Sequence, residues 1–343
     1  MPFDSTNRWL NRFVWLTAAA TLFLICSGGM VTSKGVGLAV PDWPTTFGYN
    51  MFLFPVSQWI GGIFFEHTHR LVASAVGFLT IILAVWLWCA ESRRWLRILG
   101  VVALMAVILQ GVLGGLRVTM LKDEIGIFHA CLAQAFLGLL VFIGVARSRF
   151  WQEPRQRLNT WIPVWLPLAV TILIYTQLAL GATMRHQHRD LSILDFPAAY
   201  GKVIPDVDAE TLAKVNQWRE TRALSEVTAA QIWLQMAHRF VAALIAIGVI
   251  ACWFVFRSHR GEEMLLKLSL LWVLFLGCQI TLGGWTIWSN KAADVATAHV
   301  AVGATMLAFG ISILALTLRF RAAQELIRQE TSESRLPAGA HAR

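Results

Sequence analysis

The sequence predicts an all-α integral membrane protein: eight transmembrane helices that form two four-helix bundles, repeated in parallel and related by a pseudo-twofold axis along the membrane normal. Three observations support this fold class. Of the 343 residues, 57% are hydrophobic and only 14% are charged, against roughly 25% in an ordinary soluble domain. The apolar residues fall into eight long runs, and motifs recur in the same order in both halves. These features exclude a soluble globular chain, a disordered chain and a disulfide scaffold.

Each apolar run is close to the length of about 20 residues that crosses a hydrocarbon layer about 30 Å thick. We expect transmembrane helices at approximately 13–32, 68–90, 95–116, 125–146, 161–182, 232–256, 265–288 and 295–318. No small-residue cleavage site follows the first run, so we expect a retained helix and not a signal peptide. We expect the polar segment after Arg319 to be disordered and cytoplasmic.

The distribution of Lys and Arg predicts the orientation. The segments on the side of the N-terminus carry Arg8, Arg12, Arg93, Arg94, Arg97, Arg147, Arg149, Arg155, Arg157, Arg257, Arg260, Lys267, Arg319 and Arg321. The opposite short loops carry only Lys34, Arg117, Lys122 and Lys291. The positive-inside rule therefore places both termini in the cytoplasm and the 183–231 segment outside, as an ordered cap or a mobile loop. This topology also accounts for the net charge of +9, so we expect no nucleic-acid partner.

Four motifs recur in the same order in both halves, the outer-loop motif at an offset of 153 and the other three at 169 or 170. The repeated segments are Asp42-Trp43-Pro44 and Asp195-Phe196-Pro197, His69-Arg70 and His238-Arg239, Gln110–Gly115 and Gln279–Gly284, and His129 and His299. Because four helices separate equivalent helices, the two copies share one orientation. We expect an N-terminal half over 1–150, a C-terminal half over 151–325 and a polar cytoplasmic tail over 326–343.

The repeated histidines carry the strongest functional signal. They lie within the first few residues of helices that run inward, so all four share one depth and each half can bring two together: His69 with His129, and His238 with His299. Ionisable side chains inside a membrane are costly and usually have a partner in the bundle. One histidine on each of two helices is how a helical bundle offers two axial ligands to a haem iron. Zinc or copper would need further ligands at the same depth, which the sequence lacks. Haem is therefore favoured.

Two sets of neighbouring residues have open interpretations. Arg70 and Arg239 directly follow a repeated histidine, where a guanidinium either pairs with a haem propionate or extends to the lipid headgroups. The glycine pairs of the repeat either let helices approach closely or leave room for a flat macrocycle, and helix packing is favoured. These glycines are Gly114, Gly115, Gly283 and Gly284.

The repeat fails at one chemically informative position. Glu66 lies three residues before His69 on the same helical face, whereas Gln235 holds the equivalent position before His238. Two passive electron carriers would need no asymmetric acid, so we infer that one site performs chemistry and the other transfers electrons. The alternative is a solvated Glu66 at the membrane interface.

The remaining histidines and the cysteines show no such pattern. We expect no ligation from His67, which lies off the face of Glu66 and His69, or from His186, His188, His259 and His341 in loops or the tail. All five cysteines lie inside apolar runs without metal-site spacing, so we interpret them as small hydrophobic residues and expect no disulfide.

Together these residues resemble the haem A synthase family, membrane enzymes that oxidise the C8 methyl group of haem O to a formyl group for cytochrome oxidase. The resemblance covers the chain from about residue 10 to about residue 318. It rests on Glu66–Arg70, Gly114–Arg117 followed by His129, Asp42-Trp43-Pro44, and the repeated His238 and His299.

The resemblance implies a role for each site residue. His238 and His299 would ligate a haem b cofactor, and His69 and His129 would hold the iron of the substrate haem O. Glu66 would be the catalytic carboxylate, and electrons would leave through the haem b half. Some bacterial relatives carry a cysteine pair in the outer loops, which the segments 34–65 and 183–231 lack, so no thiol function transfers to this chain.

Two other functions are weighed against this one. A dihaem electron-transfer subunit of the cytochrome b kind would also need four histidines in two pairs, but haems stacked across a membrane need ligands at two depths. A transporter built from parallel repeats, with the histidines as a proton relay, would need broken helices and polar residues at mid-span. The sequence shows neither feature.

The expected surroundings follow from the resemblance and the topology. Haem O and the lipid bilayer are the expected partners, and contact with haem O synthase, an electron acceptor or a second copy of the chain is left open. Asp4 and the lack of a long leader rich in Arg and Ser favour a bacterial inner membrane over a mitochondrial one. The haem sites would face the periplasmic side.

Overall fold

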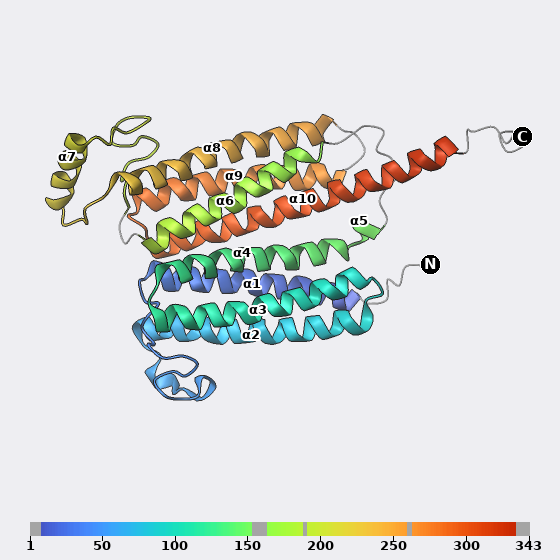
Figure 1. Ribbon diagram of the computed structural model, residues 1–343, viewed down its shortest axis with the longest axis horizontal. Coiled ribbons are helices and arrows are strands. Elements are labelled where there is room, and N and C mark those ends of the chain that lie inside the picture. Colours follow the sequence, from blue (N-terminus) through green and yellow to red (C-terminus); the bar gives the residue numbers. More distant parts are fainter. Residues whose placement is uncertain (1–7, 153–162, 188–190, 259–262, 334–343) are drawn as a thin grey trace, which may run out of the picture.

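The computed structural model describes residues 8–152, 163–187, 191–258 and 263–333 (Figure 1). Within these ranges eight helices are long and apolar enough to cross a membrane, which confirms the predicted all-α membrane fold. The interpretations of Asp4, Arg155, Arg157, His188, His259, Arg260 and His341, and of the tail beyond residue 333, concern positions outside the described residues.

The eight transmembrane helices are α1 (Arg8–Ser33), α2 (Gly61–Ala90), α3 (Arg94–Met120), α4 (Asp123–Ala146), α6 (Trp165–Gln187), α8 (Ala229–Ser258), α9 (Glu263–Trp288) and α10 (Ala293–Glu333). The shorter elements are α5 (Arg149–Gln152), α7 (Ala209–Glu220) and the 3-10 turns η1 (Met51–Leu53) and η2 (Val56–Gln58). Each apolar run becomes a helix because a helix satisfies its backbone hydrogen bonds internally, as a hydrocarbon environment requires.

The helix ends follow local chemistry more than hydropathy. α3 ends where Leu121 adopts the left-handed conformation (φ 57°). α4 begins at once, with Asp123 and Glu124 in its first turn, where acidic side chains complement the helix dipole. The expected disorder after Arg319 is wrong for the described residues, because α10 continues as a helix to Glu333.

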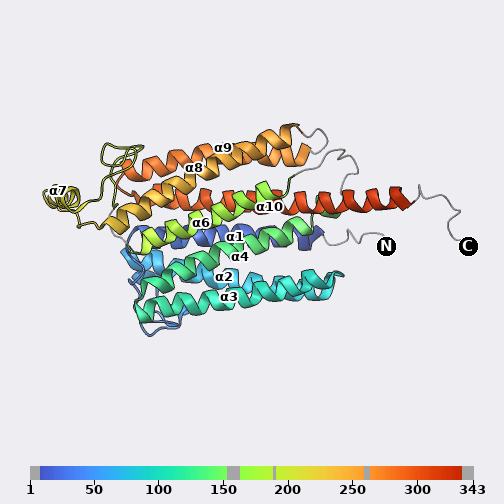
Figure 2. The same ribbon diagram turned by 45° about the horizontal axis from the view of Figure 1, so that its top comes forward.

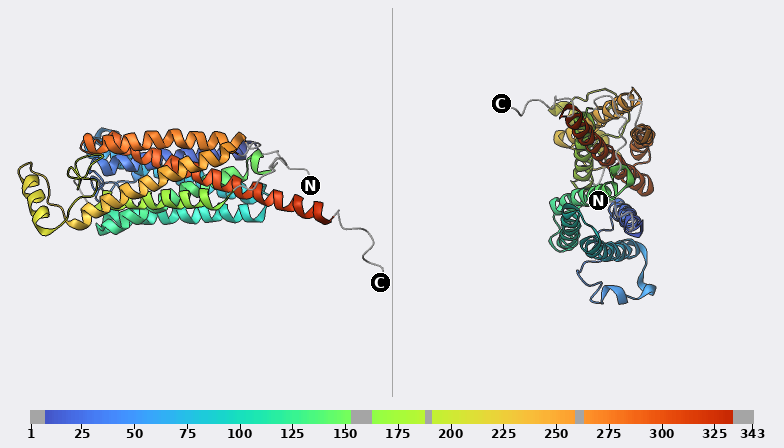
Figure 3. Two further views of the ribbon diagram at one scale, coloured as in Figure 1. Left: turned by 90° about the horizontal axis from the view of Figure 1, so that it is seen from above. Right: turned by 90° about the vertical axis from the view of Figure 1, so that its right-hand side faces the viewer.

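The helices associate in two groups of four (Figures 1 and 2). α1, α2, α3 and α4 contact one another in a closed ring, and α6, α8, α9 and α10 do the same. The groups meet through contacts of α1 with α10, α4 with α10 and α4 with α6, and lie side by side in the end view (Figure 3). We call them the N-terminal and C-terminal groups; their pseudo-twofold relation stays a prediction.

Both long connections lie at one end of the bundle, which we call the loop end (residues 34–60 and 191–228; left in Figure 1). The second connection has its own small core, which includes Ile193, Val227 and Ile232. In the last turn of α7, the fully buried Arg219 donates to the carbonyls of Leu191 (3.0 Å) and Ser225 (2.6 Å). Of the two expectations for this segment, an ordered cap therefore holds for residues 191–228.

The opposite end is closed by a buried ionic network. Glu91 accepts from Arg93 Nε (2.9 Å) and from Arg147, and Arg147 Nε donates to Asn11 Oδ1 (2.8 Å). This network joins the ends of α1, α2, α3 and α4, so two of the arginines counted as topology signals also have internal partners.

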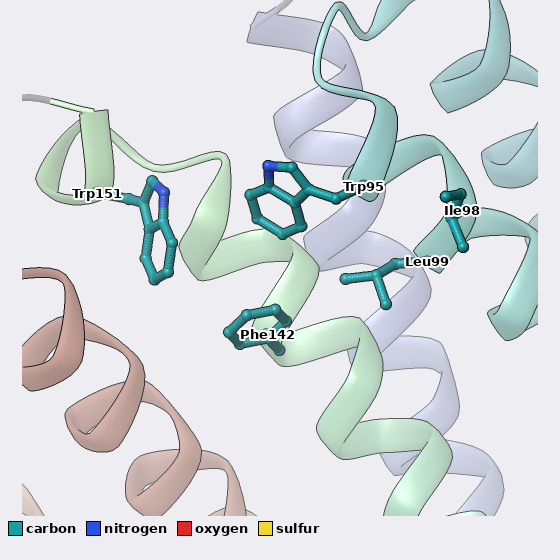
Figure 4. Close-up of a pocket in the computed structure, with 5 residues that line it drawn as sticks. All are labelled: Trp95, Ile98, Leu99, Phe142 and Trp151. Carbon is teal, nitrogen blue, oxygen red and sulfur yellow. The ribbon is translucent and has the colours of Figure 1, made fainter.

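An apolar pocket lies close to this network, between α3, α4 and α5 (Figure 4). Its lining residues are Trp95, Ile98, Leu99, Phe142 and Trp151. It is at the end of the bundle opposite the repeated histidines.

Candidate functional site

The four repeated histidines lie on four different helices near the loop end. His69 is the ninth residue of α2, His238 the tenth of α8, and His129 and His299 are each the seventh residue of their helices, α4 and α10. The expectation that they lie within the first few residues is therefore wrong by about two turns, because polar and aromatic first turns extend these helices beyond their apolar runs. The four depths remain similar.

Each imidazole packs against a glycine of the neighbouring helix. A Cβ placed on the glycine would lie 2.9 Å from His69 Cε1 at Gly28, 3.3 Å from His129 Cε1 at Gly114, 3.5 Å from His238 Cε1 at Gly181, and 3.2 Å from His299 Cε1 at Gly283. The glycines thus create the space in which the rings stand. Gly114 and Gly283 therefore lie at contacts with the neighbouring helix, as favoured, and the side chain that packs on each is a histidine ring.

The histidines form one pair in each group. His69 is an electrostatic neighbour of His129, and His238 of His299. Ser27 Oγ lies 3.3 Å from His69 Nδ1, whereas the buried Nδ1 atoms of the other three rings have no hydrogen-bond partner in the described residues. All four side chains keep some accessible surface.

The pairs fit two-ligand coordination. Within the described residues, no group of three or more His, Cys, Asp or Glu is placed to hold a metal ion. Two imidazoles per group, each held in a space that a Cβ would fill, suit the two axial positions of a haem.

Glu66 is buried, with 3% of its surface exposed, so the alternative of a solvated side chain is wrong. Its Oε2 accepts from the Val40 N–H (2.9 Å) and its Oε1 from Arg70 (2.8 Å). The same guanidinium donates to the Val40 carbonyl (2.8 Å). The acid therefore lies under the first outer loop, one turn from His69.

Gln235 holds the second outer loop in the same way. Its Oε1 accepts from the Ile193 N–H (2.9 Å) and its Nε2 donates to the Ile193 carbonyl (3.0 Å). Ile193 stands 153 residues after Val40, which is the offset of the outer-loop motifs. Glutamate and glutamine thus do the same structural work, and only the N-terminal group pairs a carboxylate with an arginine there.

Arg70 and Arg239 turn toward the outer loops. Arg70 donates to the carbonyls of Asp42 (2.7 Å) and Thr45 (3.1 Å), and Arg239 to those of Asp195 (2.7 Å) and Ala198 (2.7 Å). Neither side chain extends to the headgroups, so that interpretation is wrong. The buried Nε of Arg239 has no partner in the described residues.

Each outer loop is organised by the aspartate of its repeated motif. Asp42 Oδ1 accepts from the Phe47 N–H (2.8 Å) and Oδ2 from the Gly48 N–H (2.9 Å). Partial burial raises the pKa of Asp42, but hydrogen bonds from Gly48, Thr45 and Phe47 outweigh it, so the pKa lies below its ordinary value. The carboxylate therefore stabilises this turn at neutral pH, and the contribution is lost only as the pH falls through that lowered pKa.

The turn around Asp195 is built alike. Asp195 accepts from the N–H groups of Tyr200 and Gly201, each at 2.9 Å. Tyr200 (φ 50°) and Gly201 (φ 77°) match the left-handed conformations of Phe47 (φ 50°) and Gly48 (φ 78°).

The second glycine of each repeated pair accommodates an aromatic ring of the outer loop. A Cβ at Gly115 would lie 2.4 Å from the Trp43 ring, and one at Gly284 3.1 Å from the Phe196 ring. At these two glycines the expected helix packing is replaced by contact with a side chain of an outer loop.

We predict that Gly115→Ala displaces Trp43 and destabilises the protein by about 1–3 kcal/mol, the usual cost of overpacking. Gly111→Ala is the matched control on the same helix, since a Cβ there meets nothing within 4 Å. Thermal unfolding in detergent measures the difference, and equal melting temperatures for the two variants would contradict the assignment.

Two further histidines are placed by the structure. His67 is buried between Phe54 and Trp59 (ring centroids 5.1 and 4.7 Å), away from the paired histidines. His186 does not lie in a loop as expected: α6 continues to Gln187, and the His186 ring packs against Gly126 at the start of α4.

Sequence reasoning missed three features of the site. Gly28 and Gly181 back two of the histidines and repeat at the outer-loop offset of 153, a signal that could have found them. Arg185 gave no such signal, because its partners lie on another helix.

The fold and the site together define an integral membrane protein with eight spans and paired intramembrane histidines. The chain belongs to a family described as cytochrome oxidase assembly protein, whose model matches residues 11–311.

Three relatives named heme A synthase are similar along most of their length. The protein of Geobacillus kaustophilus is 24% identical over 97% of this chain and 99% of its own. That of Shouchella clausii is 27% identical over 78% and 84%, and that of Lysinibacillus sphaericus 24% identical over 85% and 90%.

Proposed function

We propose that this protein is a haem A synthase, an oxidoreductase that converts the C8 methyl group of haem O to the formyl group of haem A. Its similarity to proteins named heme A synthase supports this activity. The observation that carries the proposal is the combination of two histidine pairs with a buried carboxylate beside only one of them. A dihaem electron carrier would not need that acid.

The two groups have different roles in this proposal. The N-terminal group (within 1–150) binds haem O through His69 and His129. The C-terminal group (within 151–325) binds haem b through His238 and His299, and the unpartnered Nε of Arg239 is available to a propionate. When bound, haem b supplies a one-electron redox centre through which electrons from the substrate leave.

Glu66 is the catalytic carboxylate. Oxidation of the methyl carbon develops positive charge on that carbon, which a nearby carboxylate stabilises. The same group takes a proton from the water that supplies the formyl oxygen. Arg70 is a positioning residue, because it fixes one oxygen of Glu66 and the loop carbonyls above it.

The loop end is the functional side of the molecule. α1 begins and α10 ends at the opposite end (Figure 1), so we place both termini in the cytoplasm of a bacterial cell and the histidine pairs toward the periplasm. In this topology, haem O enters the N-terminal group from the lipid bilayer. An electron acceptor, haem O synthase and a second copy of the chain remain proposed partners.

The activity is tested by extracting haem from cells that contain this protein and a source of haem O. We expect haem A in the extract and its absence from cells without this chain. An extract that contains haem O alone, from cells in which the protein is present and folded, would favour the electron carrier.

A further inference from the structure

A cluster of basic side chains lies at the loop end, apart from the residues already assigned. We call Arg117, Arg185 and His186 the basic cluster. A Cβ at Gly126, on the first turn of α4, would lie 3.2 Å from Arg117 Nε and 2.7 Å from His186 Nδ1. Two side chains from different groups, one on α3 and one on α6, therefore meet over the same glycine.

The surroundings hold this cluster in place. A Cβ at Gly37 would lie 3.2 Å from the Arg117 guanidinium, so the first outer loop covers it. Arg185 donates to the Gly29 carbonyl and the Ser33 hydroxyl of α1. Arg185 also lies within electrostatic reach of both Arg117 and His186.

Among the described residues, no carboxylate forms an ion pair with the cluster. Glu66 is an electrostatic neighbour of Arg117 but is already paired with Arg70. The other acidic neighbour, Asp123, is exposed. In the described part of the chain the Arg117 guanidinium has no hydrogen-bonded or ion-paired partner, although a guanidinium carries five N–H donors.

The cluster has no basic equivalent at the repeat-related positions. The offset of 169 places Thr286 at the position of Arg117, and the offset of 153 places Thr32 and Ser33 at those of Arg185 and His186. Each basic residue thus has a small hydroxyl residue as its counterpart. Arg117 and His186 are electrostatic neighbours of His129, in the group that also holds the asymmetric Glu66, whereas Arg185 is a neighbour of His299.

We propose that Arg117 and His186, supported by the charge of Arg185, form a carboxylate-binding subsite that receives a propionate of the porphyrin held in the N-terminal group. The inference rests on the proposed function. A guanidinium matches a carboxylate through two parallel hydrogen bonds, and such charge-assisted bonds are the strong ones. Arg70 is less suited to this task because its terminal nitrogens already serve Glu66 and the loop carbonyls.

The test compares two probes that differ only in the charge of the propionates: haem with free carboxylates, and its dimethyl ester. Each is titrated by absorbance into the full-length protein after the tighter haem site has been filled. We expect the wild type to bind the free acid about 10- to 100-fold more tightly than the ester, as expected for hydrogen bonds to a charged group. Arg117→Thr, which inserts the residue of the other copy, should remove most of this preference and leave the affinity for the ester unchanged.

Two further variants make the test specific. His186→Ser should reduce the preference for the free acid over the ester severalfold. This variant keeps the test possible even if Arg117→Thr does not fold. Arg222→Thr changes an exposed arginine of the loop-end cap and should leave the preference intact. A wild-type protein without preference, or an unchanged preference in His186→Ser or in folded Arg117→Thr, would overturn the subsite. Haem A formation is scored separately. A wild-type protein that shows no preference but still produces haem A refutes the subsite alone, whereas a wild-type protein that produces no haem A refutes the proposed function.

Discussion

Glu66→Gln should reduce conversion of haem O to haem A by about 10²- to 10⁴-fold, the usual contribution of a catalytic acid or base. The fold should survive, because a glutamine already occupies the equivalent position in the C-terminal group. There the Gln235 amide binds both the N–H and the carbonyl of Ile193. The Val40 N–H can bond to the amide oxygen of a glutamine at 66 as it does to Glu66, while the Val40 carbonyl keeps its bond from Arg70. Haem A is measured in extracts, and the b-type spectrum of the purified variant should be unchanged.

The reverse substitution is the matched control. Gln235→Glu places a carboxylate under the second outer loop, beside the pair proposed to hold haem b, and should neither restore activity to Glu66→Gln nor create a second active site. Full activity in Glu66→Gln would mean that the asymmetry between the copies has no catalytic meaning.

Removal of either proposed histidine ligand to haem b should have a large effect on the absorbance spectrum. His238→Ala and His299→Ala should each abolish the low-spin b-type spectrum of the purified protein, because a single remaining imidazole cannot give bis-histidine coordination. The backing glycines Gly181 and Gly283 belong to other helices, so the helices themselves should persist. Absorbance and circular dichroism separate loss of haem from loss of fold.

His67→Phe controls for the loss of any buried histidine near the loop end. A phenyl ring keeps the contacts with Phe54 and Trp59, and the spectrum should remain. A b-type spectrum that persists in both ligand variants would remove His238 and His299 from the haem site.

Much of the fold follows directly from the sequence. The eight apolar runs gave the eight long helices of the described chain, because hydropathy over about 20 residues is a strong signal. The ends were less accurate: the first turn of α2, Gly61–Phe64, and the last part of α10 lie outside the apolar windows. The position of a helix end depends on local interactions of the backbone and of adjacent residues, and a hydropathy window does not report these interactions.

The candidate site was only partly accessible to sequence reasoning. The repeat identified the four histidines and the exchange of Glu66 for Gln235, because both are matters of residue identity at a fixed offset. It could not show that Arg70 binds loop carbonyls or that His186 reaches α4. Those contacts join segments distant in the sequence, and one of them crosses between the two groups.

The most direct measurement of the central claim is an experimental density map of the protein loaded with haem, with the two iron positions located. We predict one iron between His69 and His129 and one between His238 and His299. A haem iron outside both pairs, or four imidazoles that contact no porphyrin, would contradict it.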